Sequence, residues 1–182
     1  MSRIPQQVLP QILADLKSVF DQELRSVVLY GSAAGDDFKL GLSDINIMVV
    51  VTPAGLNELG RLAAHFARWT KDRVAPPLVL TQAEIDGSLD SFPLEFLNMS
   101  LNHEIGHGPD PLAQIEINRD DLRLQCEREL KGKLFVLREA VLASGGREDR
   151  LLKVALDSIK AFAAIFRGVL YLLGEETSSL NS

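Results

Sequence analysis

The chain has 182 residues, of which 46% are hydrophobic and 24% charged, so it can form one large or two small globular domains and is neither disordered nor collagen-like. Its 19 Lys and Arg against 25 Asp and Glu give a formal net charge of −6, which excludes an extended basic surface for nucleic acid. The lone cysteine, Cys126, excludes an internal disulfide, and no apolar run is long enough to span a membrane, so we expect a soluble, cytoplasmic protein.

The first part of the chain is predicted to combine helices and strands. Apolar residues at 4–20 recur every three or four positions, as on one face of a helix. Short apolar runs at 26–30 and 44–51 predict two strands, and a third is predicted at 78–80. The spacing of apolar residues at 56–71 predicts a helix between the second and third strands.

The segment after the third strand gives mixed signals. Thr81 and Glu84 have the spacing of a capping box, which starts a helix. Residues 92–108 first alternate like a strand and then recur at helical spacing, so periodicity does not assign them. Turn-forming residues at 106–111 mark the boundary that we expect between a first domain, 1–110, and a second domain, 111–182.

The second domain is predicted to be a helical hairpin. Helices are expected at about 119–143 and 148–173, and the short glycine turn between them makes the two antiparallel. Cys126 falls on the apolar stripe of the first helix and is expected in the core. The second helix is apolar on more than one face, so we expect it either to pack on the first domain and mediate a homodimer or to be covered by further helices outside this sequence.

The most informative motif lies on the first two predicted strands. One strand ends in Gly31-Ser32, and after ten residues the next begins with Ser43-Asp44-x-Asn46. A Gly-Ser turn lets a phosphate approach backbone amides. Residues 44 and 46 project from one face of a strand, because side chains alternate along it. Two acidic groups there would hold two Mg²⁺ ions over a triphosphate, which suits nucleotidyl transfer.

This pattern resembles the nucleotidyltransferase superfamily, which includes DNA polymerase beta, the aminoglycoside nucleotidyltransferases and small prokaryotic stand-alone forms. The match covers residues 26–51, and the expected order of elements around it is similar to the minimal family domain. The resemblance implies an α+β fold, in which a nucleotidyltransferase-like mixed sheet is flanked by helices and followed by a C-terminal helical hairpin or bundle.

The resemblance also implies the roles of the motif residues. Gly31, Ser32 and Ser43 would bind the triphosphate of an NTP, with ATP the expected one. Asp44 would be catalytic and would bind Mg²⁺, with Asn46 as the second metal position. The reaction would transfer a nucleoside monophosphate to a small molecule or a protein.

Two departures from the family pattern argue against catalysis. Asn46 is a neutral amide where the family has a second carboxylate, and an amide binds Mg²⁺ less strongly than an ionised acid. The third strand, 78–80, lacks the acid that serves active members as third ligand or general base. Asp36 and Asp37 are expected to be solvated. Two interpretations stay open: a Mg²⁺-dependent transferase, and a catalytically inactive nucleotide-binding or interaction module of the antitoxin type.

A competing motif gives a third hypothesis. His103-Glu104-x-x-His107 resembles the zincin family, in which two histidines one helical turn apart bind Zn²⁺ and the glutamate activates a water. The continuation departs from the metzincin pattern, because Asp110 and Ala113 stand where glycine and histidine are required. A zinc metallohydrolase is therefore the alternative to a surface turn with two ordinary histidines.

Four basic residues follow the motif on the predicted helix 56–71 and just beyond it. Arg61, Arg68, Lys71 and Arg73 have the reach to bind a phosphate. Because the helix is amphipathic, we expect them on its solvated face instead.

Overall fold

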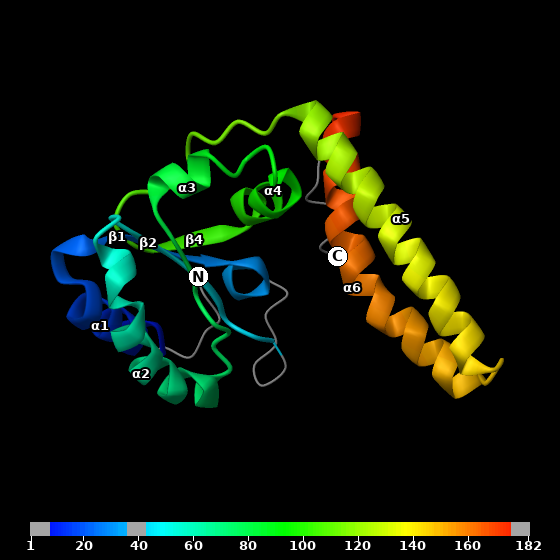
Figure 1. The fold of residues 1–182 in the computed structure, drawn as a ribbon, viewed down its shortest axis with the longest axis horizontal. Coiled ribbons are helices and arrows are strands. Elements are labelled where there is room, and N and C mark those ends of the chain that lie inside the picture. Colours follow the sequence, from blue (N-terminus) through cyan, green and yellow to red (C-terminus); the bar gives the residue numbers. More distant parts are fainter. Residues whose placement is uncertain (1–7, 36–42, 176–182) are drawn as a thin grey trace. The chain divides into compact units, whose positions relative to one another are not determined.

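The structure is a computed structural model, described here for residues 8–35 and 43–175, with a mixed sheet flanked by helices and a C-terminal helical hairpin (Figure 1). This confirms the predicted α+β class. The chain divides into two compact units. The first comprises Met1–Ser88 and Met99–Ile115, and the second comprises Leu89–Asn98 and Glu116–Ser182. Each unit is described separately below.

A four-stranded sheet forms the centre of the first unit. Its strands are β1 (Leu24–Tyr30), β2 (Asn46–Val51), β3 (Leu78–Leu80) and β4 (His103–His107), in the order β3-β2-β1-β4. β1 is antiparallel to β2 and to β4, whereas β2 and β3 are parallel. The last pair between β1 and β2 joins Tyr30 to Asn46, so the end of β1 lies beside the start of β2.

The two faces of this sheet are both buried. α1 (Val8–Phe20) and α2 (Leu59–Trp69) pack on one face, where a single core joins residues of both helices to inward residues of β1 and β2. On the other face, Val28, Met48 and Val50 are no more than 1% exposed. Burial on two sides explains why β1 and β2 are continuous apolar runs rather than alternating ones.

Several element boundaries differ from those predicted. The predicted helix 56–71 consists of a 3-10 turn at Gly55–Glu58, then α2, then a second 3-10 turn at Thr70–Asp72. The second strand begins two residues later than predicted, because Ile45 makes only an isolated bridge with Val74 before β2 starts.

The segment after β3, whose periodicity is mixed, contains both helices and a strand. Thr81 and Glu84 form the predicted capping box at the start of α3 (Gln82–Asp86). Residues 92–108 contain a helix, α4 (Pro93–Leu101), and then the edge strand β4, which explains why neither period fitted the whole segment.

The second unit is built on two long helices, α5 (Arg119–Ser144) and α6 (Glu148–Leu173). Both lie within a residue of the predicted ranges. Asn118 caps α5, since its side-chain oxygen accepts hydrogen bonds from the backbone N–H groups of Asp120 and Asp121. The helices are antiparallel, and the start of α5 packs on the end of α6 around buried Cys126. None of the helices in the described ranges is long and apolar enough to cross a membrane.

The first part of α4 belongs to this helical core. Buried Gln125 on α5 accepts a hydrogen bond from the backbone N–H of Leu94 at 2.8 Å and donates one to Glu95 at 2.6 Å. On α6, the guanidinium of Arg167 donates to Asn98 at 2.7 Å. These polar contacts hold α4 against both long helices. They lie at the end of the hairpin where the start of α5 and the end of α6 form the core that the described residues show.

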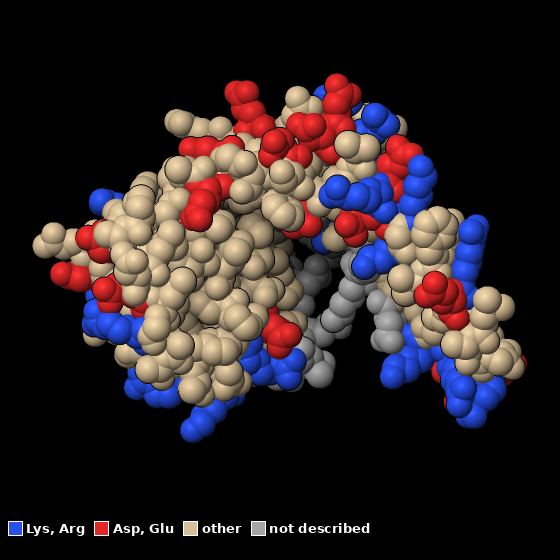
Figure 2. All heavy atoms as spheres, viewed as in Figure 1, with Lys and Arg blue, Asp and Glu red and all other residues tan. Residues whose placement is uncertain are grey.

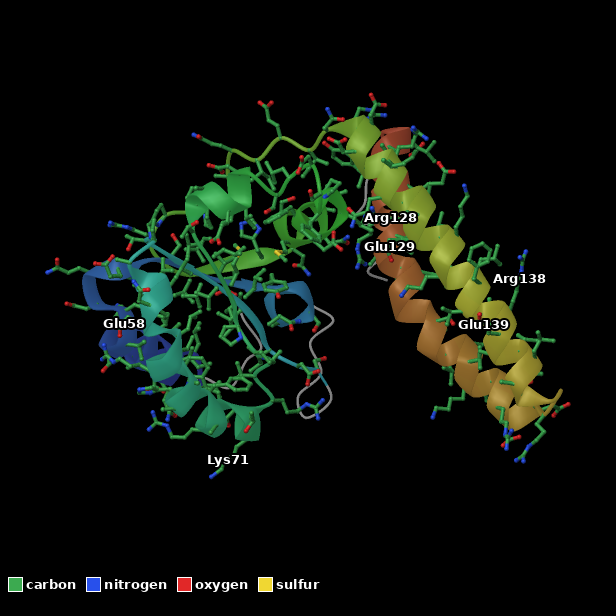
Figure 3. The ribbon with its side chains drawn as sticks, in the orientation of Figure 1. Glu58, Lys71, Arg128, Glu129, Arg138 and Glu139 are labelled. Atoms are coloured by element: carbon green, nitrogen blue, oxygen red, sulfur yellow. The ribbon has the colours of Figure 1, made fainter. Side chains whose placement is uncertain are left out.

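The rest of the hairpin leaves apolar side chains exposed. Charged residues such as Arg128, Glu129, Arg138 and Glu139 lie along α5 (Figure 3). On α6, one stripe alternates steps of four and three residues, the heptad spacing by which helices pair. The stripe comprises Leu152, Leu156, Ile159, Ala163, Phe166, Leu170 and Leu173. Leu152, Leu156 and Ile159 are 57–62% exposed, so this side of α6 has no covering element among the described residues.

Close packing at Gly168 yields a test of the helical core. A Cβ at Gly168 would lie 2.6 Å from Leu94 and 2.8 Å from Cys126, whereas one at Gly132 on α5 would meet nothing within 4 Å. We expect Gly132→Ala to raise the free energy of unfolding by about 0.5–1 kcal/mol through helix propensity. Gly168→Ala should lower it by about 1 kcal/mol, because overpacking outweighs that gain. Urea denaturation measures both, and equal stabilisation would contradict this packing.

Candidate functional site

The turn after β1 has the backbone conformation that its glycine allows. Gly31 lies at φ +69° and starts a 3-10 turn, Gly31–Ala34, directly after the last residue of β1. This left-handed region is readily adopted only by glycine. Ser32, the next residue, is half-buried in the turn. The predicted Gly-Ser pair therefore forms a sharp turn at the end of a buried strand.

Asn102, which lies 71 positions after Gly31 in the sequence, holds this turn in place. The backbone N–H of Gly31 donates to the carbonyl of Asn102 at 3.2 Å, and the side-chain amide of Asn102 donates to the carbonyl of Gly31 at 3.1 Å. A Cβ at Gly35 would lie 2.5 Å from the same amide nitrogen. Asn102 thus contacts both ends of the turn and fixes its position relative to β4.

The second part of the motif lies beside the turn. Asn46 starts β2, and a Cβ on Gly31 would be 3.5 Å from its amide nitrogen. Ile45 is buried in the core shared with α1 and α2, so Asp44 and Asn46 project from the opposite side of the extended chain. The structure therefore brings Gly31, Asp44 and Asn46 to one end of the sheet, with half-buried Ser43 preceding them.

Asp44 is paired with an arginine. Its carboxylate accepts a hydrogen bond from the guanidinium of Arg73 at 2.8 Å, and the two side chains are 60% and 47% exposed. The backbone supports this contact, since the N–H of Ile45 donates to the carbonyl of Arg73 at 2.9 Å. Arg73 is exposed, as expected, but it lies beyond α2 rather than on the helix, because the chain turns after α2 and runs beside Asp44.

The described residues do not fit a two-ion Mg²⁺ centre. Mg²⁺ demands oxygen ligands in octahedral geometry and is usually held by one or two carboxylates. Here Asp44 is ion-paired, Asn46 is neutral, and β3 consists of leucine and valine alone. Within the described ranges, no three Asp, Glu, His or Cys side chains lie close enough to hold a metal together. Asp36 and Asp37 lie outside the described residues.

Tyr30, the residue before the turn, contributes no charge to it. Burial raises the pKa of the Tyr30 phenol, which precedes Gly31, so this hydroxyl stays neutral at physiological pH. On the face shown in Figure 2, basic side chains of the first unit gather along its lower margin, over α2, and form no continuous basic surface.

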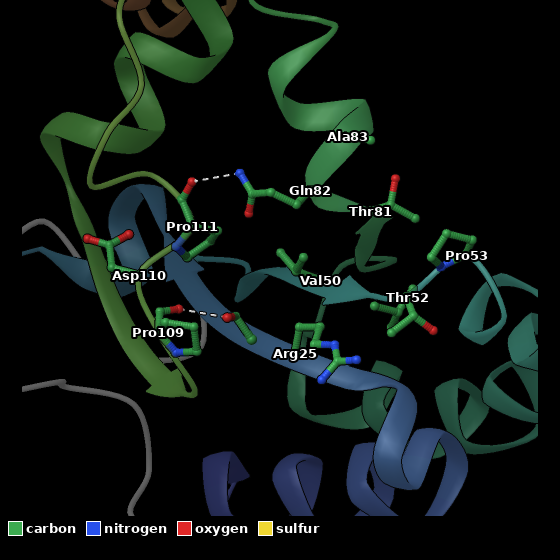
Figure 4. Close-up of a pocket in the computed structure, with 12 residues that line it drawn as sticks. Arg25, Val50, Thr52, Pro53, Thr81, Gln82, Ala83, Pro109, Asp110 and Pro111 are labelled. Carbon is green, nitrogen blue, oxygen red and sulfur yellow. Dashed lines mark hydrogen bonds between the residues drawn. The ribbon is translucent and has the colours of Figure 1, made fainter.

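A hollow of about 410 Å³ lies elsewhere in the first unit (Figure 4). It is lined by Arg25, Val50, Thr52 and neighbours, at the end of the sheet where β1 begins. Ser26, also in its wall, is four residues before Tyr30, which separates it from the Gly31 turn by roughly 13 Å along the strand. The hollow is therefore distinct from the candidate site.

The zinc hypothesis is wrong. His103-Glu104-x-x-His107 forms strand β4 instead of a helix, because these residues pair with β1. The register places His103 opposite Tyr30 and His107 opposite Val27, which point to opposite faces of the sheet. His103 instead contacts Asp110 at 3.1 Å through Nε2 and the carbonyl of Ser100 at 3.0 Å through Nδ1. Two histidines on opposite faces cannot share a Zn²⁺ ion.

The chain matches no protein-family model and no curated protein sequence. Among solved structures it is similar to spectinomycin adenyltransferase AAD(9) from Enterococcus faecialis, determined with ATP and spectinomycin. The two share 15% sequence identity at a TM-score of 0.45, over 96% of this chain and 93% of that one. An identity this low and a TM-score below 0.5 leave the functional argument to the residues of the chain itself.

Sequence reasoning missed two residues of this site. Asn102 lies 71 positions from Gly31, and no local pattern connects the two. Arg73 lies 29 positions from Asp44, and the sequence does not predict that the two form an ion pair. The bridge between Val74 and Ile45 explains why Arg73 lies beside Asp44, but the sequence around Val74 has no pattern that predicts this pairing.

The role of Asn102 can be measured through stability. Asn102→Ala removes a part-buried hydrogen bond to the turn and should lower the free energy of unfolding by about 1–2 kcal/mol. Asn57→Ala is the matched control, since its amide donates to a backbone carbonyl at 3.1 Å but is exposed; it should cost less than about 0.5 kcal/mol. If both variants unfold at the same urea concentration, Asn102 does not hold the turn.

Proposed function

We propose that this chain is a nucleotide-binding protein of the nucleotidyltransferase class, which binds the phosphates of a nucleoside triphosphate, ATP in the first place, at the turn after β1. The observation that carries the proposal is the left-handed Gly31 turn, fixed by Asn102 and placed beside Asp44 and Asn46. Backbone amides at such a turn can approach a phosphate closely. A location in the cytoplasm is part of the same proposal, since Cys126 is a free thiol.

Among the two interpretations of this class, the geometry favours binding without two-metal catalysis. The carboxylate that would hold a first Mg²⁺ is engaged by Arg73, and Asn46 takes the second position. Mg²⁺-dependent transfer is the second candidate, and one observation favours it: the Asp44 side chain is 60% exposed and accessible to an ion from solvent. Transfer of label from α-labelled ATP to a small molecule or to protein would establish this second candidate.

The turn itself provides the test of nucleotide binding. Gly31→Ala strains a backbone at φ +69° and puts a methyl group against Asn46, so we expect the Kd for ATP to rise about tenfold. Gly145→Ala is matched, because Gly145 has φ +63° and open space around it in the turn between α5 and α6. It should leave the Kd unchanged in isothermal titration.

Two results would contradict the proposal. One is an absence of ATP binding by the unaltered chain. The other is an equal Kd in the Gly31 and Gly145 variants after circular dichroism has shown that both are folded.

We also propose that the exposed stripe of α6 pairs with the same stripe of a second copy. Antiparallel pairing about a two-fold axis at Ala163 sets Leu152 against Leu173 and Ile159 against Phe166, so the stripe is complementary to itself. Ala163, the smallest member, allows the helices to approach closely at the axis.

A charge on the stripe should abolish this dimer. Ile159→Glu is expected to sediment as a monomer at concentrations where the unaltered chain is dimeric, because the charge would be buried without a partner. Leu142→Glu changes a residue of α5 that is 81% exposed and lies off the stripe, and it should remain dimeric. A monomeric unaltered chain would refute the dimer.

A further inference from the structure

Arg73 lies where a cation at this site would be expected. Its guanidinium is 2.8 Å from Asp44, the carboxylate at the position that binds a metal ion in the pattern described above. Arg73 and Asp44 carry opposite unit charges and Asn46 carries none, so these three side chains are neutral together. A centre for two divalent cations requires several negative charges, whereas the guanidinium that these three described side chains contribute suits an anion.

The backbone holds Arg73 in this place. Arg73 has φ +59°, one of two non-glycine residues with positive φ in the described ranges. Its carbonyl accepts from Ile45 at 2.9 Å, and the N–H of Ala75 donates to the carbonyl of Ile45 at 3.0 Å, so the segments on both sides of the ion pair are joined. An arginine in the left-handed region carries a conformational cost that glycine would avoid. The backbone thus fixes where the Arg73 side chain begins, and Asp44 contacts its guanidinium.

Guanidinium chemistry fits a polyphosphate. The group presents five N–H donors in a planar fork that matches phosphate oxygens, and it can hold a carboxylate and a phosphate at the same time. It stays charged at every physiological pH and needs no metal. Asp44, the partner of Arg73, and the Gly31 turn lie at the same end of the sheet, so we expect the phosphate chain of a nucleotide bound at the turn to extend toward this side chain.

We propose that Arg73, oriented by Asp44, binds the phosphates of the nucleotide and replaces the divalent cations of a two-metal site, so that nucleotide binding is independent of metal. Asp44 is then a positioning residue for a cation of the chain itself. The inference rests on the proposed nucleotide binding at Gly31 and adds the source of the positive charge.

Titration of the full chain with ATP, in excess EDTA and in MgCl₂, tests the inference. The Kd in EDTA should lie within about threefold of the Kd in MgCl₂, since no bound metal carries the interaction. Arg73→Gln should raise the Kd at least about tenfold in both buffers, and Arg73→Lys should recover part of the loss. Arg123→Gln is the matched control, because Arg123 is an exposed arginine paired with one carboxylate on α5, and its Kd should not change.

Asp44→Asn separates the two roles of Asp44. The amide oxygen still accepts from Arg73 while a negative charge near the phosphates is lost, so the Kd in EDTA should fall about threefold. If Asp44 is a metal ligand instead, ATP binds only with Mg²⁺ and this variant loses it, which would overturn the inference. An unchanged Kd in folded Arg73→Gln would overturn it as well. Both differ from failure of the proposed function, in which the unaltered chain binds ATP in neither buffer.

Discussion

The antiparallel pairing of β1 with β2 is the constraint on which the whole candidate site depends. Both strands are buried on two faces, so their side chains pack in apolar surroundings on either side of the sheet. In the register observed, Tyr30 faces Asn46. Gly31, Asn46 and Asp44 come together because the chain leaves β1 and enters β2 at this same end. The apolar core thus fixes a polar arrangement that the polar residues could not fix themselves.

Two contacts from outside this strand pair then determine the chemistry of the site. Asn102 binds the backbone of Gly31 on both its N–H and its carbonyl, so the turn is held from β4. Arg73 pairs with Asp44 and neutralises the carboxylate of the motif. An exposed ion pair contributes little to stability, and its effect lies in the local charge. The motif therefore retains its shape while its electrostatics differ from those of a site built from several carboxylates.

The helical unit follows a different balance of forces. Its core lies at one end of the hairpin, where Gly168 allows α6 to approach α4 and α5 closely. There Gln125 accepts a hydrogen bond from the backbone N–H of Leu94, at the start of α4. Toward the other end, apolar side chains on α6 remain exposed at heptad spacing. Asn118 caps the start of α5, and left-handed glycines at 145 and 174 end the two helices. The exposed stripe then leaves surface available for a partner.

Patterns local in sequence determined much of this protein. The strand 78–80, the capping box at Thr81 and the two long helices follow from periodicity and caps, which act over a few residues. The expected juxtaposition of residues 31, 44 and 46 needed only the pairing of neighbouring strands. Only the tertiary structure decided that 103–107 is a strand, since pairing with β1 outweighs helical spacing there. It also decided that Arg73 meets Asp44 and Asn102 meets Gly31, because contacts between residues 29 and 71 positions apart arise from the packing of the sheet and leave no local pattern.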